Sequence, residues 1–111
     1  MNTLAELFKT FSDESRLRIY SLLLAAGELC VCNIEETLGF TQTKVSRHLS
    51  YLKRAGLVKS RKHGLWMYYS LVDPKNAEQR SLLMDLAERL KTSPTTQRDL
   101  KRLAKRLRIG C

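Results

Sequence analysis

The spacing of apolar residues changes once along this chain and later changes back, and this switch limits the possible folds. Before Gly56, apolar residues recur every three to four positions, which is typical of amphipathic helices. Residues 57–62 and 65–72 are instead rich in β-branched and aromatic residues, with His63-Gly64 as a turn signal between them. Helical spacing then returns. The pattern predicts a mainly α protein with one β-hairpin.

The helices are delimited by capping and breaking residues. Gly27 and Gly39 end two of them, and Thr41 is a candidate N-cap for the next. Asp73-Pro74 predicts the start of the helix after the hairpin, since Pro suits the first helical position. Ser93-Pro94 then separates a last helical segment. We expect a main domain over residues 1–92 and a basic helical tail over residues 93–111.

The helices over residues 31–38 and 42–54 are joined by Gly39-Phe40-Thr41, a helix-turn-helix signature. The second helix of such a motif lies in the major groove of DNA. Gln and Arg can form paired hydrogen bonds with base edges, whereas Ser, Thr and Lys can hold phosphates. We predict that the outward residues contact DNA: Gln42, Thr43, Lys44, Ser46, Arg47 and His48.

The hairpin follows this motif directly and would form a wing beside it. Basic residues cluster near its tip, where we expect contact with the DNA backbone or the minor groove: Lys59, Arg61, Lys62 and His63. The whole chain has 20 Lys and Arg against 11 Asp and Glu, which suits a polyanionic partner. Six basic residues against Asp99 lie within residues 98–108, so part of this excess belongs to the tail.

The three cysteines, Cys30, Cys32 and Cys111, do not form an even disulfide framework. The sequence has no secretory signal and no apolar stretch of about 20 residues that could span a membrane. We therefore expect a cytoplasmic protein with reduced thiols and no membrane partner. No nucleophile–base pair, phosphate-binding glycine loop or carboxylate pair is apparent, so we expect neither an enzyme nor an organic cofactor.

Several segments, in this order along the chain, resemble the ArsR/SmtB family of metal-responsive repressors. They are residues 11–17 (FSDESRL), 28–33 (ELCVCN), 41–49 (TQTKVSRHL), 52–58 (LKRAGLV) and 67–71 (MYYSL). The resemblance covers roughly residues 4–90. It implies a winged helix-turn-helix homodimer, packed through its first and last main helices. Such a dimer binds double-stranded operator DNA and leaves it when a metal or metalloid ion binds.

The Cys30-Val31-Cys32 motif resembles the arsenic(III)/antimony(III) branch of this family and also the cadmium/lead branch. Soft thiolates prefer soft ions. The family's cadmium sites recruit cysteines from an N-terminal extension, and no cysteine precedes the first helix here, so we expect As(III) or Sb(III) as inducer. The zinc branch uses Asp and His of the last helix, and residues 75–90 contain no His. Glu35 stands where arsenic repressors carry a third cysteine, so the candidates for the third ligand are water, a buffer thiol and Cys111.

Other functions remain open from the sequence. In the same fold, the signal could be cadmium or lead, or oxidation of Cys30 or Cys32. A protein of a different class would coat DNA through charge alone. Side chains two positions apart on a helix point about 200° away from each other, because each residue turns about 100°. We therefore hypothesise that chelation by both thiolates unwinds or reorients the start of the helix over residues 31–38.

Overall fold

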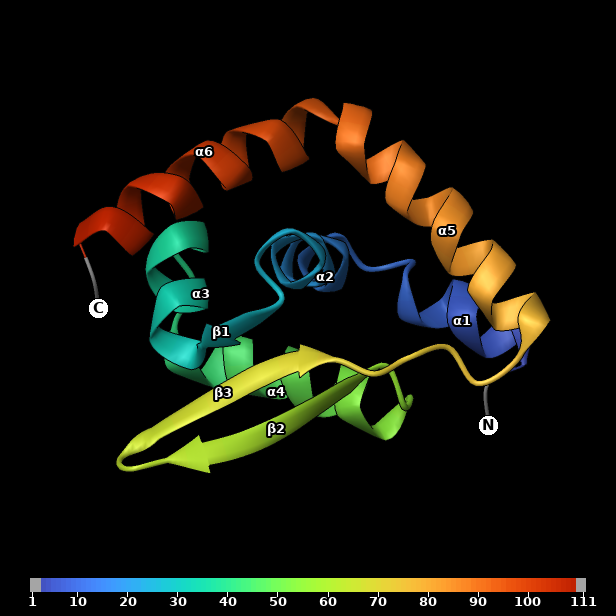
Figure 1. Cartoon of the computed structure of the whole chain (residues 1–111), viewed down its shortest axis with the longest axis horizontal. Coiled ribbons are helices and arrows are strands. Elements are labelled where there is room, and N and C mark those ends of the chain that lie inside the picture. Colours follow the sequence, from blue (N-terminus) through green and yellow to red (C-terminus); the bar gives the residue numbers. More distant parts are fainter. Residues whose placement is uncertain (1–2, 110–111) are drawn as a thin grey trace.

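The structure, a computed structural model, describes residues 3–109. In chain order its elements are α1 (Leu4–Thr10), α2 (Glu14–Ala26), β1 (Glu28–Cys30), α3 (Val31–Leu38), α4 (Gln42–Arg54), β2 (Val58–His63), β3 (Trp66–Leu71), α5 (Ala77–Thr92) and α6 (Pro94–Ile109). Figure 1 shows α2 near the centre, α5 and α6 arching over it, and the β2–β3 hairpin projecting below. The predicted mainly α fold with a winged helix-turn-helix is confirmed.

Within the described residues, three strands form an antiparallel sheet in the order β1-β3-β2. The pairing of His63 with Trp66 leaves Gly64 and Leu65 as the turn, one position later than expected. Gly64 has a φ of +62°, which suits a tight hairpin turn. The sequence did not predict β1, because three residues are too few to show the alternation that marks a strand.

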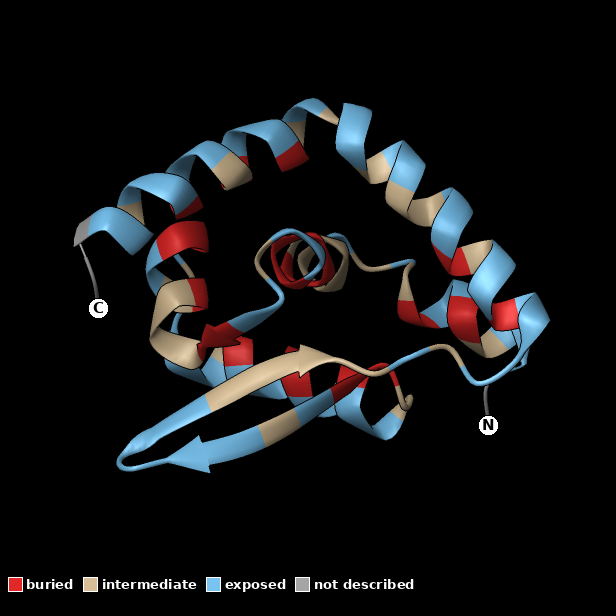
Figure 2. Ribbon diagram, viewed as in Figure 1, coloured by how far each residue is buried: buried red, intermediate tan, exposed pale blue. Residues whose placement is uncertain are grey.

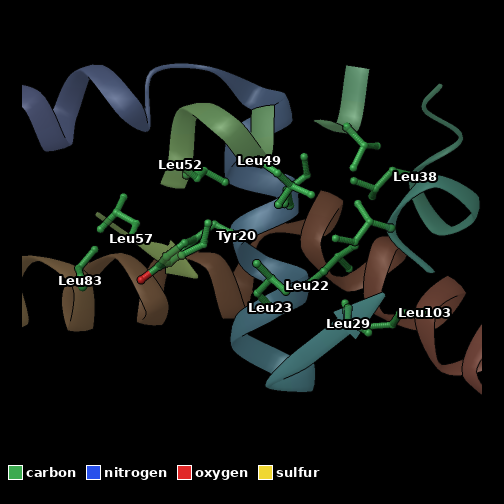
Figure 3. Close-up of a cluster of buried hydrophobic side chains, with 14 of the residues drawn as sticks. Tyr20, Leu22, Leu23, Leu29, Leu38, Leu49, Leu52, Leu57, Leu83 and Leu103 are labelled. Atoms are coloured by element: carbon green, nitrogen blue, oxygen red, sulfur yellow. The ribbon is translucent and has the colours of Figure 1, made fainter. Parts of the chain in front are cut away.

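The core forms around α2, whose buried residues contact the helices and strands that surround it. Ile19, Leu22 and Leu23 of this helix are fully buried. In Figure 3, Leu22 and Leu23 lie among side chains contributed by α3, α4, α6 and β1. Figure 2 shows the same arrangement from outside, with buried positions turned inward and an exposed hairpin tip. The helix-turn-helix and the sheet therefore share one core.

Helix α5 begins later than the sequence predicts. Asn76, not Asp73, is its N-cap, and the Asn76 Oδ1 atom accepts a hydrogen bond from the Gln79 N–H at 2.8 Å. Val72 N–H still donates to the Leu57 carbonyl at 2.9 Å, so strand-like pairing continues just past β3. The expected start at Asp73-Pro74 is wrong because these residues instead connect the sheet to α5.

Helix α6, the predicted basic tail, packs against α2 and α3. Leu103 is buried in the core, whereas Leu107 on the same helix is 49% exposed. The Asp99 carboxylate is only 1% exposed and accepts two hydrogen bonds from Arg18 of α2, at 2.9 and 3.0 Å. These bonds raise the pKa of Arg18. No helix within residues 3–109 is both long and apolar enough to cross a bilayer.

Candidate DNA-binding surface and cysteine pair

The turn between α3 and α4 is fixed by local hydrogen bonds. Gly39 ends α3 in the left-handed region, with φ of 70° and ψ of 29°, and its N–H donates to the Glu35 carbonyl at 2.8 Å. A residue with a Cβ would be strained in that conformation. Thr41 then caps α4, since its Oγ1 atom accepts a hydrogen bond from the Lys44 N–H at 3.2 Å. These two residues set the angle between the helices.

Helix α4 presents most of its predicted DNA-contacting residues to solvent. One side of the helix buries Val45, Leu49 and Leu52 completely. Lys44 is half-buried, because its Nζ atom lies 3.9 Å from the centroid of the Phe40 ring. The exposed residues on the other side are Gln42, Thr43, Ser46 and Arg47. Their contact with DNA stays a prediction, but their side chains are accessible for it.

His48 is the exception among the predicted contacts on α4. Its side chain is buried, only 6% exposed, because it follows Val45 by three positions and precedes Leu52 by four on the core side of the helix. Burial lowers the pKa of His48 below its ordinary value of 6.5. The burial of His48 argues against its predicted contact with DNA, which no observation tests, and places the residue in the packing beneath the surface.

The hairpin is tied to the helix-turn-helix at its base. Lys53, near the end of α4, donates from its Nζ atom to the Ser60 Oγ atom of β2 at 2.8 Å. In this structure its ammonium group links the recognition helix to the wing, so the two candidate DNA-contacting elements are held together.

All four predicted wing residues are exposed, but Arg61 is engaged within the protein. Its Nε and Nη2 atoms donate to the two carboxylate oxygens of Glu28 on β1, each at 2.8 Å. Its guanidinium also lies 4.9 Å from the centroid of the Tyr68 ring. The hydrogen bonds from Arg61 hold the pKa of Glu28 below its usual value. Sequence reasoning missed Glu28, because only the strand pairing brings it to the wing.

The two cysteines of the motif lie together at the junction of β1 and α3. Cys30 is the last residue of β1 and the N-cap of α3, and Cys32 is in the first turn of that helix. Their Sγ atoms are 2.8 Å apart. The Cys30 Sγ atom also accepts a hydrogen bond from the Cys32 N–H at 3.3 Å. The structure thus brings both sulfurs to one point.

This geometry contradicts the premise of the hypothesis that chelation unwinds or reorients the start of α3. That premise applied regular helical spacing to both cysteines. The φ of −70° and ψ of 147° at Cys30 are instead those of extended backbone, which directs its side chain back over the first turn of α3. The two sulfurs therefore converge while α3 keeps its first turn.

The sulfur pair supplies two soft donors. Among residues 3–109, no three or more His, Cys, Asp or Glu side chains are grouped so that they could hold a metal ion. Glu35 lies on α3 and is half-buried. The third candidate ligand, Cys111, lies outside the described residues. Two cysteine sulfurs, once both are thiolates, can bind a thiophilic ion if a further ligand completes its coordination.

Comparisons with known proteins give a consistent result. A family profile described as "Bacterial regulatory protein, arsR family" matches residues 13–60. An uncharacterized HTH-type transcriptional regulator of Methanocaldococcus jannaschii is 45% identical over 82 residues, which are 74% of this chain and 92% of that protein. These matches span the helix-turn-helix and most of the fold around it.

Two further relatives are named for arsenical and cadmium resistance. The arsenical resistance operon repressor of Escherichia coli is 48% identical over 60% of this chain. A Staphylococcus aureus homolog of the cadmium resistance regulatory protein CadC is 42% identical over 62% of it. The chain covers 56% and 57% of these two proteins, little more than half of their lengths.

Solved structures agree with the sequence comparison. Reduced HlyU from Vibrio cholerae has a TM-score of 0.66 at 32% identity, covering 80% of this chain and 88% of that one. A homodimeric winged helix-turn-helix DNA-binding domain from Mycobacterium bovis has a TM-score of 0.62 at 33% identity, covering 77% and 78%. The likeness therefore includes the wing and the surrounding helices as well as the helix-turn-helix.

Proposed function

The chain is a transcriptional repressor of the ArsR family of bacterial regulatory proteins, and on this premise we propose that As(III) or Sb(III) induces it by binding Cys30 and Cys32. The observation that carries the proposal is the 2.8 Å separation of the two sulfurs. Thiolates are soft ligands and select thiophilic ions. Cys111, or a small-molecule thiol, would supply a third sulfur.

The operator would be read by α4 and held by the wing. Gln42 and Arg47 carry side chains that can form two hydrogen bonds with one base edge. Lys59 and Lys62 are exposed on the hairpin and suit contacts with phosphates. A surface with these side chains would bind some base sequences more tightly than others. A protein that coats DNA by charge alone would have no such preference.

The cysteine pair would act on DNA binding through the start of α3. In the ion-free chain, the Cys30 Sγ atom accepts the hydrogen bond that caps this helix. An ion held by both sulfurs would fix their separation and so change the geometry of this hydrogen bond at the start of the helix. Helix α3 packs against both α4 and α6, so a shift of its first turn reaches the recognition helix.

We also propose that the operator-binding form is a homodimer that packs through α1 and α5. Both helices expose large apolar side chains: Phe8 is 62% exposed and Met84 is 64% exposed. Aromatic and methionine side chains are enriched at the buried centre of protein interfaces, so these two residues suit a dimer contact. The related Mycobacterium bovis domain is a homodimer. Sedimentation equilibrium of the wild type beside Phe8→Asp would test this contact.

The inducer is tested by titrating the complex with a fluorescent operator duplex, selected by the wild-type protein from a random library. Arsenite, antimonite, cadmium and zinc are each added under reducing conditions, with fluorescence anisotropy as the readout. We expect release by arsenite or antimonite in the wild type and no release in Cys30→Ser/Cys32→Ser. The Cys111→Ser variant shows whether that residue is the third ligand.

The same titration separates the alternatives. Release by cadmium alone would contradict As(III) and Sb(III) and favour a cadmium regulator, as the Staphylococcus aureus relative is named. Release by peroxide, together with a loss of titratable thiols and no response to any ion, would favour oxidation as the signal. Release that persists unchanged in Cys30→Ser/Cys32→Ser would exclude the cysteine pair as the sensor.

A further inference from the structure

One carboxylate lies among the cations of the wing. Glu28 of β1 and Lys59 of β2 are both paired with Ser70 of β3, and Arg61 is paired with Tyr68. Residues two apart on a strand, and residues paired across strands, share one face of a sheet. Glu28, Lys59, Arg61 and His63 therefore lie on the same face of this sheet.

The electrostatic contacts agree with this placement. The charges of Arg61, Lys59 and His63 all favour the ionised form of Glu28. Arg61 reaches diagonally across β3 and binds both oxygens of the carboxylate through parallel hydrogen bonds. An arginine binds a phosphate through the same forked arrangement of N–H groups. The carboxylate thus occupies the position that a DNA phosphate would take on this side of the wing.

We infer that Glu28 competes with DNA for Arg61, so that the wing binds the operator backbone fully only after this ion pair opens. The inference rests on the proposed contact between the wing and DNA. Two hydrogen bonds to Glu28 hold the guanidinium along the sheet, and its charge is neutralised there. A phosphate that binds Arg61 must take over these hydrogen bonds. Glu28 is therefore a positioning residue whose removal strengthens DNA binding.

The exposure of the pair limits the size of the effect. The side chains of Arg61 and Glu28 are 54% and 35% exposed, so water screens their attraction. An exposed ion pair of this kind contributes little, and a polyanion with many phosphates can displace it. Glu28 therefore reduces operator affinity without abolishing it, and DNA can open the pair at ordinary salt concentrations.

The position of Glu28 also connects the wing to the cysteine pair. Strand β1 contains only three residues, with Glu28 at one end and Cys30 at the other. A displacement of Cys30 is transmitted along this short strand to the carboxylate that holds Arg61. The competitor for the wing cation is thus attached to the element that carries the proposed sensor.

A double-mutant cycle tests the competition. Operator affinity and its salt dependence are measured for the wild type, Glu28→Gln, Arg61→Ala and the double variant. We expect Glu28→Gln to tighten binding about two- to fivefold, the range that corresponds to one exposed ion pair. In the Arg61→Ala background the same change should have almost no effect. In Glu28→Gln the slope of log affinity against log salt should stay nearly the same, because DNA opens the pair in the wild type as well and Arg61 neutralises the same phosphate in both proteins.

Glu36→Gln is the matched control, since it removes the same charge from an exposed ion pair between α3 and α6, formed with Arg106. It should leave operator affinity unchanged. An equal gain from Glu28→Gln with and without Arg61 would overturn the inference, because Glu28 would then act through net charge alone. Unchanged or weaker binding in Glu28→Gln would overturn it as well. Circular dichroism and melting temperatures show that each variant is folded.

The variant Lys59→Ala/Lys62→Ala separates the proposed contact between the wing and DNA from the competition by Glu28. If this variant loses operator affinity and Glu28→Gln has no effect, only the competition is wrong. If Lys59→Ala/Lys62→Ala binds like the wild type, the wing does not contact DNA and both statements fail. Release by arsenite is measured separately in all variants, so the role of the cysteines is judged independently.

Discussion

Helices α4 and α6 are both amphipathic and both carry several basic residues, yet the structure places them differently. The exposed side of α4 mixes Gln, Thr and Ser with Arg, and the helix contacts the wing strand β2. The exposed side of α6 carries mainly Lys and Arg, and the helix packs across α2 and α3. Net charge alone does not locate a DNA-reading surface. Uncharged polar side chains beside a wing are the more specific sign.

The inner faces of the two helices differ as well. Helix α4 buries aliphatic residues and one histidine, whereas α6 buries the Asp99 carboxylate against Arg18 of α2. A buried ion pair contributes little net stability, but removing one partner is costly because the other is left without compensation. This pair fixes how α6 lies on the core. Helix α6 is therefore part of the folded unit, and α4 is the helix that we propose contacts DNA.

The largest effect is expected from truncating the buried leucine side chain of α6. Leu103→Ala should lower the free energy of unfolding by about 2–4 kcal/mol, because it leaves a cavity in the core. Leu107→Ala on the same helix should have a much smaller effect, since Leu107 is half-exposed. Urea denaturation of both variants provides the measurement. Equal losses would show that α6 does not pack as described.

The next effect concerns base recognition by α4. Arg47→Ala should weaken operator binding by about 1–3 kcal/mol, the value of one paired contact to a base, and relax the preference at one base pair. Arg108→Ala on α6 is the control and should bind with wild-type specificity. Binding to a set of single-base operator variants gives both quantities. A uniform loss across all sequences would show that Arg47 contacts only phosphate.

A smaller effect is expected from the outer face of α6. Neutralising two exposed cations, Lys101→Gln/Lys105→Gln, removes charge without touching the core. Operator affinity should fall no more than about twofold, and the salt dependence should keep its slope, because these residues neutralise no phosphate. A slope reduced by about two would place α6 on the DNA and remove the distinction between the two helices.

The smallest effect concerns His48 on the inner face of α4. Because burial lowers the pKa of His48 in the folded chain, protonation favours the unfolded chain. The neutral His48 side chain stabilises the folded chain fully above the unfolded pKa of about 6.5. This stabilisation is lost as the pH falls toward the lower folded pKa. The melting temperature of the wild type should fall more between pH 7.5 and 5.5 than that of His48→Gln. An identical fall in both proteins would contradict this.

Much of the fold could be predicted from the sequence, because long periodic segments and capping residues determine it locally. Gly39 and Thr41 marked the turn of the helix-turn-helix, and the residues after Gly56 marked the hairpin. Strand β1 could not be predicted, since its pairing with β3 depends on residues about 40 positions away. The start of α5 was misplaced because the end of the sheet delays it.

The sequence indicated most residues of the candidate site, but it did not predict how their side chains are arranged. The Cys30-Val31-Cys32 motif was apparent, but the extended backbone of Cys30 depends on the pairing of β1. His48 looked accessible because helical spacing alone does not fix how wide the buried stripe is. Glu28 gave no signal of its own, because its partner Arg61 lies 33 positions away.

In the proposed mechanism, ion binding at the cysteine pair and operator binding each change the affinity of the other. Coupling between two binding sites is reciprocal, so DNA must weaken ion binding by the same factor by which the ion weakens DNA binding. The arsenite affinity of the wild type, measured with and without saturating operator duplex, tests this most directly. We predict weaker arsenite binding on DNA, by the factor found in the release titration. The same arsenite affinity in both conditions would contradict the account.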